Sequence, residues 1–236
     1  MEKQEILGIG INTTDTRALE QIESTVFSLL FNFASFSEVN ISDSISGHNY
    51  RCTQIASILL DNLNYQNLCL DDQMLFKSSK NVKKYLIQSC GLHDLGKATV
   101  PVQILTKPSA LSEPELIIMK EHTTRPDLEV FSQLALDGNL FVTIMRECIR
   151  SHHENYNGQN GYPDNTSGTN IPFVGRLMRV IDVLDGLMTK SPYSDAYEFE
   201  DAYEQIIKLH GVLFDPIIVD SLVKSKQQIR TIMERK

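Results

Sequence analysis

The residues most suited to chemistry are histidines, and five of the six in the chain stand near another group that can bind a metal ion. Two adjacent pairs occur, His93 with Asp94 and His152 with His153. Three further polar groups lie on the apolar stripes of predicted helices: His48, His122 and Asp182. A buried polar group without a partner is unfavourable, and metal coordination would satisfy all of these groups together.

The chemical types of these groups narrow the choice of metal. Imidazole and carboxylate ligands without thiolates suit iron, manganese or zinc, and a carboxylate that bridges suits two ions a few ångströms apart. Taken alone, each histidine is more often an ordinary core or surface residue. The way the histidines are distributed therefore carries the prediction of a metal site.

Helices are expected to position these groups. Apolar residues follow helical spacing nearly everywhere, and no convincing run alternates apolar with polar residues, so the sequence predicts an all-α fold. The helices predicted to carry site residues begin at His48, run over 82–93 with a stop at Gly96, begin at Ser112, run over 141–152 and begin at Pro172. Pro126 is predicted to start a short helix, and Asp215 with Pro216 the last one.

The polar loop over 154–170, rich in Asn, Gly, Ser and Thr, follows the His152–His153 pair directly. Long loops of this kind in compact domains are usually functional. We therefore expect this loop to lie beside the site.

In their order along the chain, these blocks resemble the HD-GYP domains of the HD phosphohydrolase superfamily. The resemblance covers roughly Gly47 to Val219 and rests on HNYRCTQIA, GLHDLGKATVPVQILTKPSALSEPE, MKEH, HHENYNGQNGYP, IPFVGRLMRVIDVLDGLMTKSPY and GVLFDP. It implies an all-α HD-domain bundle with a dinuclear metal site in the core and a GYP loop beside it. It also implies iron or manganese as the metal, and hydrolysis of the bacterial second messenger cyclic di-GMP to pGpG and in some members GMP.

Carried over residue by residue, the resemblance implies seven metal ligands in two sites. One site would use His48, His93, Asp94 and Asp182. The other would use His122, His152 and His153, with Asp94 bridging the two. A hydroxide between the ions would be the nucleophile, and the ions would neutralise charge on the phosphoryl oxygens. His210 is left over and is interpreted as a structural or surface residue.

Lys97, three residues beyond Asp94, resembles the family lysine that contacts the scissile phosphate. Lys97 and Asp94 are therefore the expected catalytic residues. Besides Lys97, the expected substrate contacts are Gly161, Tyr162, Arg176, Asp185 and Lys190. Each has an ordinary alternative: a cation at a helix end for Lys97, a salt bridge with Arg51 for Asp185, helix packing for Arg176 and a plain turn for the GYP segment.

Several positions depart from the family pattern. The loop carries Asn157 in place of an aspartate and one extra residue between its glycines. Ser191 stands where many members have an arginine, with Lys190 as a neighbouring substitute. Ser44 replaces a carboxylate that supports a third metal in some relatives, so two ions are expected. Pro126 stands where a glycine is common.

Residues 1–40 lie mostly outside the resemblance and are predicted as an N-terminal helical extension, with residues 41–236 as the HD-GYP domain. Thr14 or Asp15 is predicted to cap the helix of this extension. The side chains expected to pack against the domain are Leu19, Ile22, Val26, Leu29, Leu30 and Phe33. The extension either covers the core or forms a homodimer.

Composition sets further limits. A net charge of −8 over 236 residues argues against binding to duplex nucleic acid. There is no apolar run long enough for a membrane span and no signal-peptide pattern, so we expect a cytoplasmic protein. The four cysteines are far apart and are predicted to be reduced thiols.

Two alternatives to cyclic di-GMP hydrolysis remain open at this point. The altered loop and Ser191 are compatible with a weak or inactive cyclic-dinucleotide receptor or protein-interaction module. A hydrolase of another cyclic dinucleotide, such as cyclic GMP-AMP, is the second. The resemblance also suggests a GGDEF-domain protein as a partner of the GYP loop.

Overall fold

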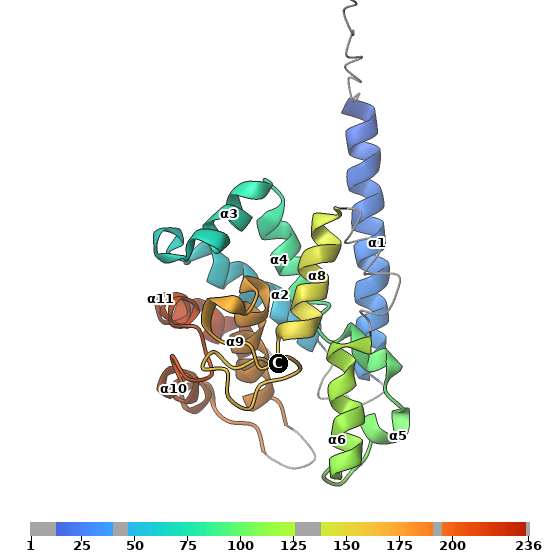
Figure 1. Cartoon of the computed structure of the whole chain (residues 1–236), viewed down its shortest axis with the longest axis vertical. Helices are drawn as coiled ribbons and strands as arrows, with labels where there is room; N and C mark the ends of the chain where they lie inside the picture. The colour runs from blue at the N-terminus through green and yellow to red at the C-terminus, as the bar shows by residue number, and fades with distance from the viewer. Residues whose placement is uncertain (1–12, 40–46, 126–137, 191–194, 235–236) are drawn as a thin grey trace, which may run out of the picture.

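The computed structural model describes residues 13–39, 47–125, 138–190 and 195–234 (Figure 1). Within these ranges the chain forms helices and loops and no β-strand, which confirms the predicted all-α fold. The α-helices are α1 (Thr13–Val39), α2 (His48–Asp61), α3 (Leu70–Ser78), α4 (Val82–Cys90), α5 (Val102–Leu105), α6 (Glu113–Lys120), α8 (Leu140–Ser151), α9 (Phe173–Leu187), α10 (Phe199–Lys208) and α11 (Pro216–Met233). Short 3-10 helices are η2 (Tyr65–Asn67), η3 (Leu95–Thr99), η4 (Glu121–Thr123) and η6 (Gly168–Asn170).

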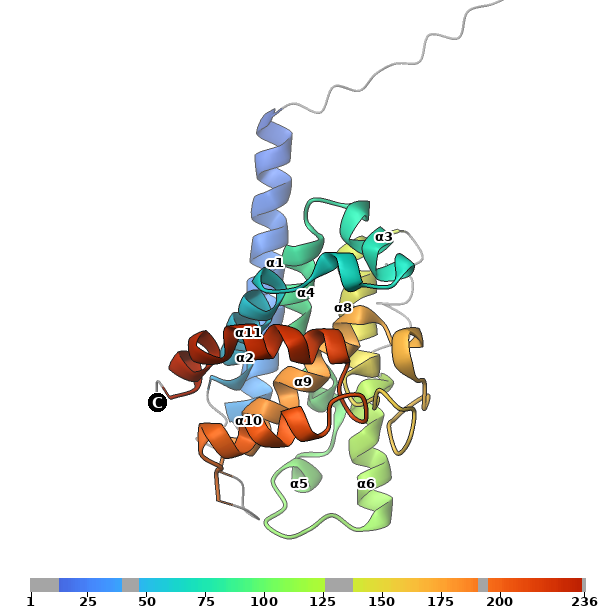
Figure 2. The same cartoon turned by 90° about the vertical axis from the view of Figure 1, so that its left-hand side faces the viewer.

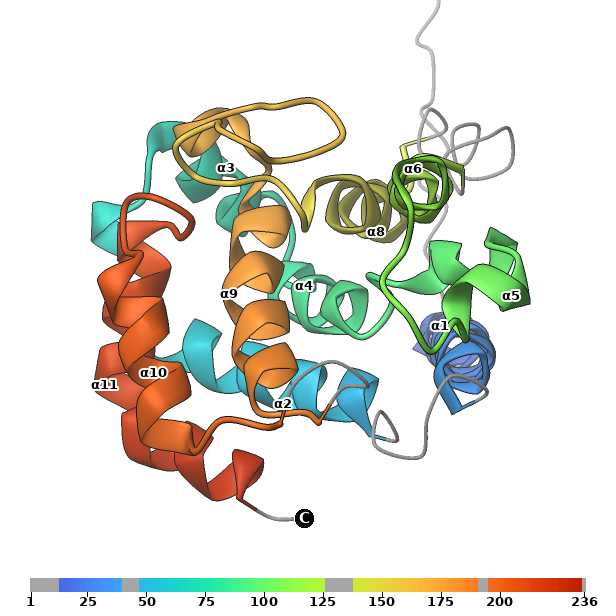
Figure 3. The same ribbon diagram turned by 90° about the horizontal axis from the view of Figure 1, so that it is seen from below.

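The main core lies where α2, α4, α8, α9 and α11 pack on one another (Figure 3). In that view α9 lies between α10 and α11 on one side and α4 and α8 on the other. The apolar stripe of α9 is fully buried, with Leu177, Ile181 and Leu184 at most 1% exposed. Burial of such side chains is the dominant favourable term in folding, so this core fixes the helix ends that carry the histidines.

The contact between α8 and α9 depends on one glycine. A Cβ atom added at Gly175 would lie 2.0 Å from the Ser151 Oγ and 2.8 Å from the Ser151 Cβ. Real side chains do not approach this closely, so only glycine lets the two backbones come together here. Ser151 immediately precedes His152, and the glycine therefore sets the position of the histidine pair.

Two predicted helix starts are confirmed in detail. Ser112 and Glu115 form a capping box in which the Ser112 backbone N–H donates to Glu115 Oε2 at 2.7 Å. The Asp215 side chain caps α11 by accepting a hydrogen bond from the Ile217 N–H at 2.9 Å, and Pro216 occupies the first turn.

The predicted end of the helix over 82–93 was wrong. α4 ends at Cys90 with Gly91 at the C-cap, and a turn follows it, so Gly96 is not the stop. The reason lies in the site, because the turn brings the His93 ring back so that its Nδ1 donates to the Cys90 carbonyl at 2.9 Å.

The N-terminal helix α1 lies along one side of the domain, and its first half extends beyond it (Figures 1 and 2). The side chains that pack on the domain are Phe27, Leu30, Phe31 and Ala34, which join Leu92, Leu95, Val142, Met145 and Ile149 in a second, smaller core. Of the predicted packing face, Leu30 is correct, but Ile22, Val26, Leu29 and Phe33 are between 45% and 66% exposed. Two apolar stripes run along this helix, and spacing alone does not choose between them.

Other expectations have mixed outcomes. Cys52, Cys90 and Cys148 are buried free thiols and Cys69 is half-buried, as predicted. None of the described helices is both long and apolar enough to cross a membrane. Ser44, Pro126 and Ser191, on which several family departures rest, lie outside the described residues.

Candidate metal centre

The predicted ligands converge from helix ends that are far apart in sequence. His48 begins α2, His93 and Asp94 follow α4, His122 lies in η4, and His152 and His153 follow α8. Two groups have potential ligand atoms within 4.8 Å of one another: His48, His93 and Asp94 in one, and His122, His152 and His153 in the other. The rings of His93 and His152 are 5.0 Å apart, so the two groups are contiguous.

We name these groups the first cluster (His48, His93, Asp94 and Asp182) and the second cluster (His122, His152 and His153). Asp182 belongs to the first because its Oδ1 lies 3.8 Å from the Nε2 atoms of both His48 and His93. The side chain of Asp182 is 22% exposed, whereas His93 is fully buried. Asp182 thus lies at the solvent side of the first cluster.

Hydrogen bonds fix the orientation of four rings. The Nδ1 atoms of His93, His122 and His152 face the carbonyls of Cys90, Met119 and Ile149 at 2.9, 2.6 and 2.9 Å, and Nδ1 of His48 faces the Asp185 carboxylate at 2.7 Å. Carbonyls and carboxylates only accept, so Nδ1 carries the proton in each ring. The Nε2 atoms are left to serve as ligands, which is the usual arrangement of metal-binding histidines.

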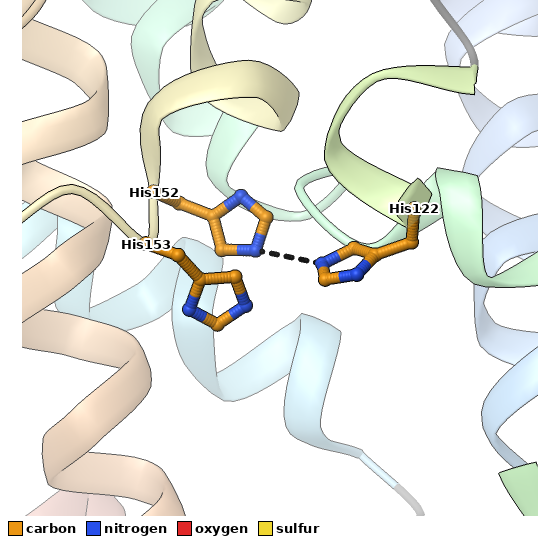
Figure 4. Close-up of side chains that lie close together, drawn as sticks. All are labelled: His122, His152 and His153. Atoms are coloured by element: carbon orange, nitrogen blue, oxygen red, sulfur yellow. Dashed lines mark hydrogen bonds between the residues drawn. The ribbon is translucent and has the colours of Figure 1, made fainter. Parts of the chain in front are cut away.

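These Nε2 atoms face one another in pairs. His48 and His93 approach to 3.3 Å between their Nε2 atoms, and His122 and His152 do the same (Figure 4). The facing lone pairs need a cation or a proton between them. In Figure 4 the His153 ring lies beside the other two, and it is 4.1 Å from the His152 ring between centroids.

Asp94 offers one oxygen to each cluster. Its Oδ2 is 3.2 Å from His93 Nε2, whereas its Oδ1 is 3.5 Å from His122 Nε2 and 3.7 Å from His152 Nε2. Oδ1 is buried and has no hydrogen-bond donor. A buried carboxylate oxygen without a donor is unfavourable unless a cation lies beside it, so the residues present fit a carboxylate that bridges two ions.

Burial and charge act differently on the two clusters. Burial lowers the pKa values of His122, His152 and His153, which keeps these rings neutral and able to bind metal. Burial also acts to lower the pKa of His93, but the adjacent negative charge of Asp94 outweighs it and raises the value to about 9. A proton on His93 thus occupies the place that a cation would take.

Asp185 supports the first cluster from behind. It is 1% exposed, and it accepts from His48 Nδ1 at 2.7 Å and from Arg51 Nε at 2.6 Å. Burial alone would raise the pKa of Asp185, but the hydrogen bonds from Arg51 and His48 lower it to about 2. The predicted substrate contact is therefore wrong for Asp185, which instead orients His48, the role expected if it formed a salt bridge with Arg51.

The two predicted lysines have different surroundings. Lys97 Nζ contacts Asp94 Oδ2, and its side chain is 28% exposed, so its charge lies at the bridging carboxylate within reach of solvent. Lys190 is exposed and lies 3.7 Å from Asp195. Only Lys97 is placed by the structure against a cluster.

Arg176 has a structural position. It is 3% exposed, and its guanidinium binds Asp72 at 2.7 Å and also contacts Asp215. Burial alone would lower the pKa of Arg176, but the two carboxylates raise it. The predicted ligand contact is wrong, because the guanidinium is already committed to two carboxylates that join α9 to α3 and to the start of α11.

The GYP segment packs directly on the second cluster. Tyr162 stacks on the His153 ring at 4.6 Å, and the Lys120 ammonium lies 5.0 Å from the centre of the Tyr162 ring. A Cβ atom at Gly161 would lie 2.7 Å from the Asn155 backbone nitrogen, so this position requires glycine. Gly161 is thus a packing residue, and Tyr162 shields a ligand.

Two residues of this region were not singled out from the sequence. Glu154 holds the loop in place, since its Oε1 accepts from the backbone N–H groups of Asp164 and Asn165 at 2.6 and 3.1 Å. Lys120 lies on α6 against the face of Tyr162. Their positions in the quoted blocks, directly after His153 and two residues before His122, were the available signal.

Comparison with known proteins agrees with this geometry. The HD domain family matches residues 75–218. The chain is 37% identical over 141 residues to the cyclic di-GMP phosphodiesterase response regulator RpfG of Xanthomonas campestris, which is 60% of this chain and 36% of that protein. It is 33% identical over 144 residues to a cyclic di-GMP phosphodiesterase of Thermotoga maritima, covering 61% and 38%.

A third relative has a different substrate in its name. The chain is 32% identical over 133 residues to the 3'3'-cGAMP-specific phosphodiesterase 2 of Vibrio cholerae, covering 56% of this chain and 24% of that protein. The chain belongs to the HD domain family, and the predicted HD-GYP membership is confirmed. Its clusters fit the divalent metal binding that this family implies. In these alignments the chain spans between 24% and 38% of the relatives' length.

Proposed function

We propose that this chain is a metal-dependent phosphodiesterase that hydrolyses cyclic di-GMP to pGpG, and in a second step to GMP. The observation that carries the proposal is the position of Asp94, whose two carboxylate oxygens each face one cluster of histidines. The names of the relatives from Xanthomonas campestris and Thermotoga maritima support the choice of substrate.

We further propose two ions, with iron or manganese as the metal. Imidazole and carboxylate donors without a thiolate suit both metals. When bound, the two ions would activate a water molecule and neutralise charge on the phosphoryl oxygens.

The protein residues perform the remaining tasks. Hydrogen bonds at Nδ1 hold the His48, His93, His122 and His152 rings with Nε2 directed inward. Lys97 places a positive charge beside Asp94, where an anionic phosphoryl group would approach the bridging carboxylate. Tyr162 covers His153 and limits the access of water to the second cluster.

The test is hydrolysis of cyclic di-GMP by protein that is purified without oxygen and reloaded with ferrous or manganous ion. We expect product that is absent with His93→Ala and unchanged with His210→Ala, since His210 is exposed and belongs to neither cluster. Tight binding of cyclic di-GMP without product, in protein shown to hold two ions, would overturn the enzyme and favour a receptor.

Cyclic GMP-AMP is the second candidate substrate, because one relative is a 3'3'-cGAMP-specific phosphodiesterase. Comparing kcat/KM for the two cyclic dinucleotides decides between them. A faster rate with cyclic GMP-AMP would transfer the proposal to that substrate.

A GGDEF-domain protein is proposed as a partner of the GYP segment, as the family resemblance suggests. Tyr162 is only half-buried, so part of its ring is accessible. Cross-linking to a purified GGDEF domain through a photoreactive residue at position 162 tests this, and absence of a cross-link would reject it.

A further inference from the structure

A row of large apolar side chains on α1 faces away from the rest of the molecule. Ile22, Val26, Leu29 and Phe33 are 59%, 45%, 66% and 56% exposed. We call these four residues the α1 stripe. They are spaced by four, three and four residues, and the same spacing continues in the sequence to Leu19 and Phe36. This is the heptad pattern of a coiled-coil seam.

The domain does not use the α1 stripe for its own packing. The side chains of α1 that contact the domain are Phe27, Leu30, Phe31 and Ala34, which lie on a different face of the helix. The first half of α1 extends beyond the domain (Figures 1 and 2). An isolated helix of a few turns is marginal in water, so this half requires a partner for its stability.

Spacing and charge identify the partner. Knobs-into-holes packing requires a second helix with the same heptad spacing, and a second copy of α1 has it. Between positions 18 and 37 the only charged residues are Glu20 and Glu23. Glu23 is occupied by Lys84 of its own chain at 3.3 Å. Two copies therefore meet without like-charge repulsion along the seam, and the stripe offers no charge to a partner of opposite charge.

We propose that α1 pairs with α1 of a second copy through this stripe, as a two-stranded coiled coil that makes the protein a homodimer. The 27-residue helix is about 40 Å long, which is enough for more than three heptads. The pairing does not depend on the metal chemistry, because none of the cluster residues lies on α1.

The experiment is sedimentation velocity on the full chain from about 1 to 100 µM, with two lysine variants on the same helix. Leu29→Lys places a charge in the middle of the stripe. Ser28→Lys adds the same charge one residue away at an exposed position outside the stripe. We expect the unchanged chain and Ser28→Lys to be dimers, and Leu29→Lys to raise the dissociation constant at least tenfold.

Two outcomes would overturn the pairing. A chain that is monomeric over the whole range would mean that another helix covers the stripe, and a dimer that Leu29→Lys leaves intact would place the interface elsewhere. Folding is checked by circular dichroism, and the milder Leu29→Ala is measured alongside. Because Leu29 is 66% exposed, neither variant disturbs the core.

Discussion

The two halves of the metal centre are built from different materials. The first cluster has two carboxylates, Asp94 and Asp182, and behind it stand the charged side chains of Asp185 and Arg51. The second cluster has three imidazoles and no carboxylate of its own, and behind it stand backbone carbonyls and the ring of Tyr162. Asp94 is the single residue that faces both.

This difference assigns different strengths to the two halves. A divalent ion in the first cluster meets two negative charges in a buried environment, where charge interactions are weakly screened. An ion in the second cluster meets one shared charge and neutral rings. We therefore expect the first cluster to fill before the second when metal is titrated into the metal-free protein.

The largest expected effect is that of removing the shared carboxylate. Asp94→Ala should abolish binding at both clusters and reduce hydrolysis by roughly 10²–10³-fold or more, since it takes away the bridging ligand and the partner of Lys97. Metal content measured by plasma mass spectrometry, alongside His210→Ala, checks this. Two equivalents of metal retained in Asp94→Ala would contradict the bridge.

The next effect separates the halves. His153→Ala should leave one ion in the first cluster, whereas Asp182→Ala should weaken the first cluster and spare the second, because each residue faces one cluster only. Calorimetric titration with Mn²⁺ should give one remaining site of high affinity for His153→Ala and one of low affinity for Asp182→Ala. Identical titrations of the two variants would show that the halves do not act separately.

A smaller effect is expected behind the first cluster. Asp185→Asn keeps the shape of the side chain but removes the charge that holds His48 and Arg51, so affinity at the first cluster should fall about 10–100-fold. The matched control is Asp195→Asn, an exposed carboxylate beside Lys190. Equal affinities for the two variants would remove Asp185 from the supporting role.

A still smaller effect is expected behind the second cluster. Tyr162→Ala removes the ring stacked on His153, and ring pairs of this kind contribute roughly 0.5–1.5 kcal/mol. Affinity at the second cluster should fall by about three- to tenfold, and Tyr162→Phe should restore it because the ring is kept. A loss with Tyr162→Phe as large as with Tyr162→Ala would assign the effect to the hydroxyl.

The residues of the site show what sequence reasoning reaches. His48, His122 and Asp182 were found because helical spacing put polar groups on apolar stripes, and all three lie at the clusters. The helix α10 was missed although Phe199, Ala202 and Ile206 are buried at helical spacing, so that signal was present in the sequence.

Other features depend on contacts that no local pattern contains. The partners of Arg176 lie 104 and 39 residues away, so its burial followed from the tertiary fold and not from its neighbours. Likewise, α1 carries two apolar stripes, and which one meets the domain was decided by the surface formed by Leu92, Leu95, Val142, Met145 and Ile149.

The smallest expected effect on metal binding is that of Arg176→Met, even though its effect on stability is large. The substitution leaves Asp72 and Asp215 buried without their cation, and breaking a buried ion pair in this way costs about 3–5 kcal/mol. Urea denaturation should show this loss, whereas Mn²⁺ affinity of the folded variant should be unchanged, because Arg176 contacts neither cluster. A double variant with Asp72→Leu should recover part of the stability by removing one stranded carboxylate. A drop in Mn²⁺ affinity or a rise in KM without loss of stability would instead return Arg176 to the substrate site.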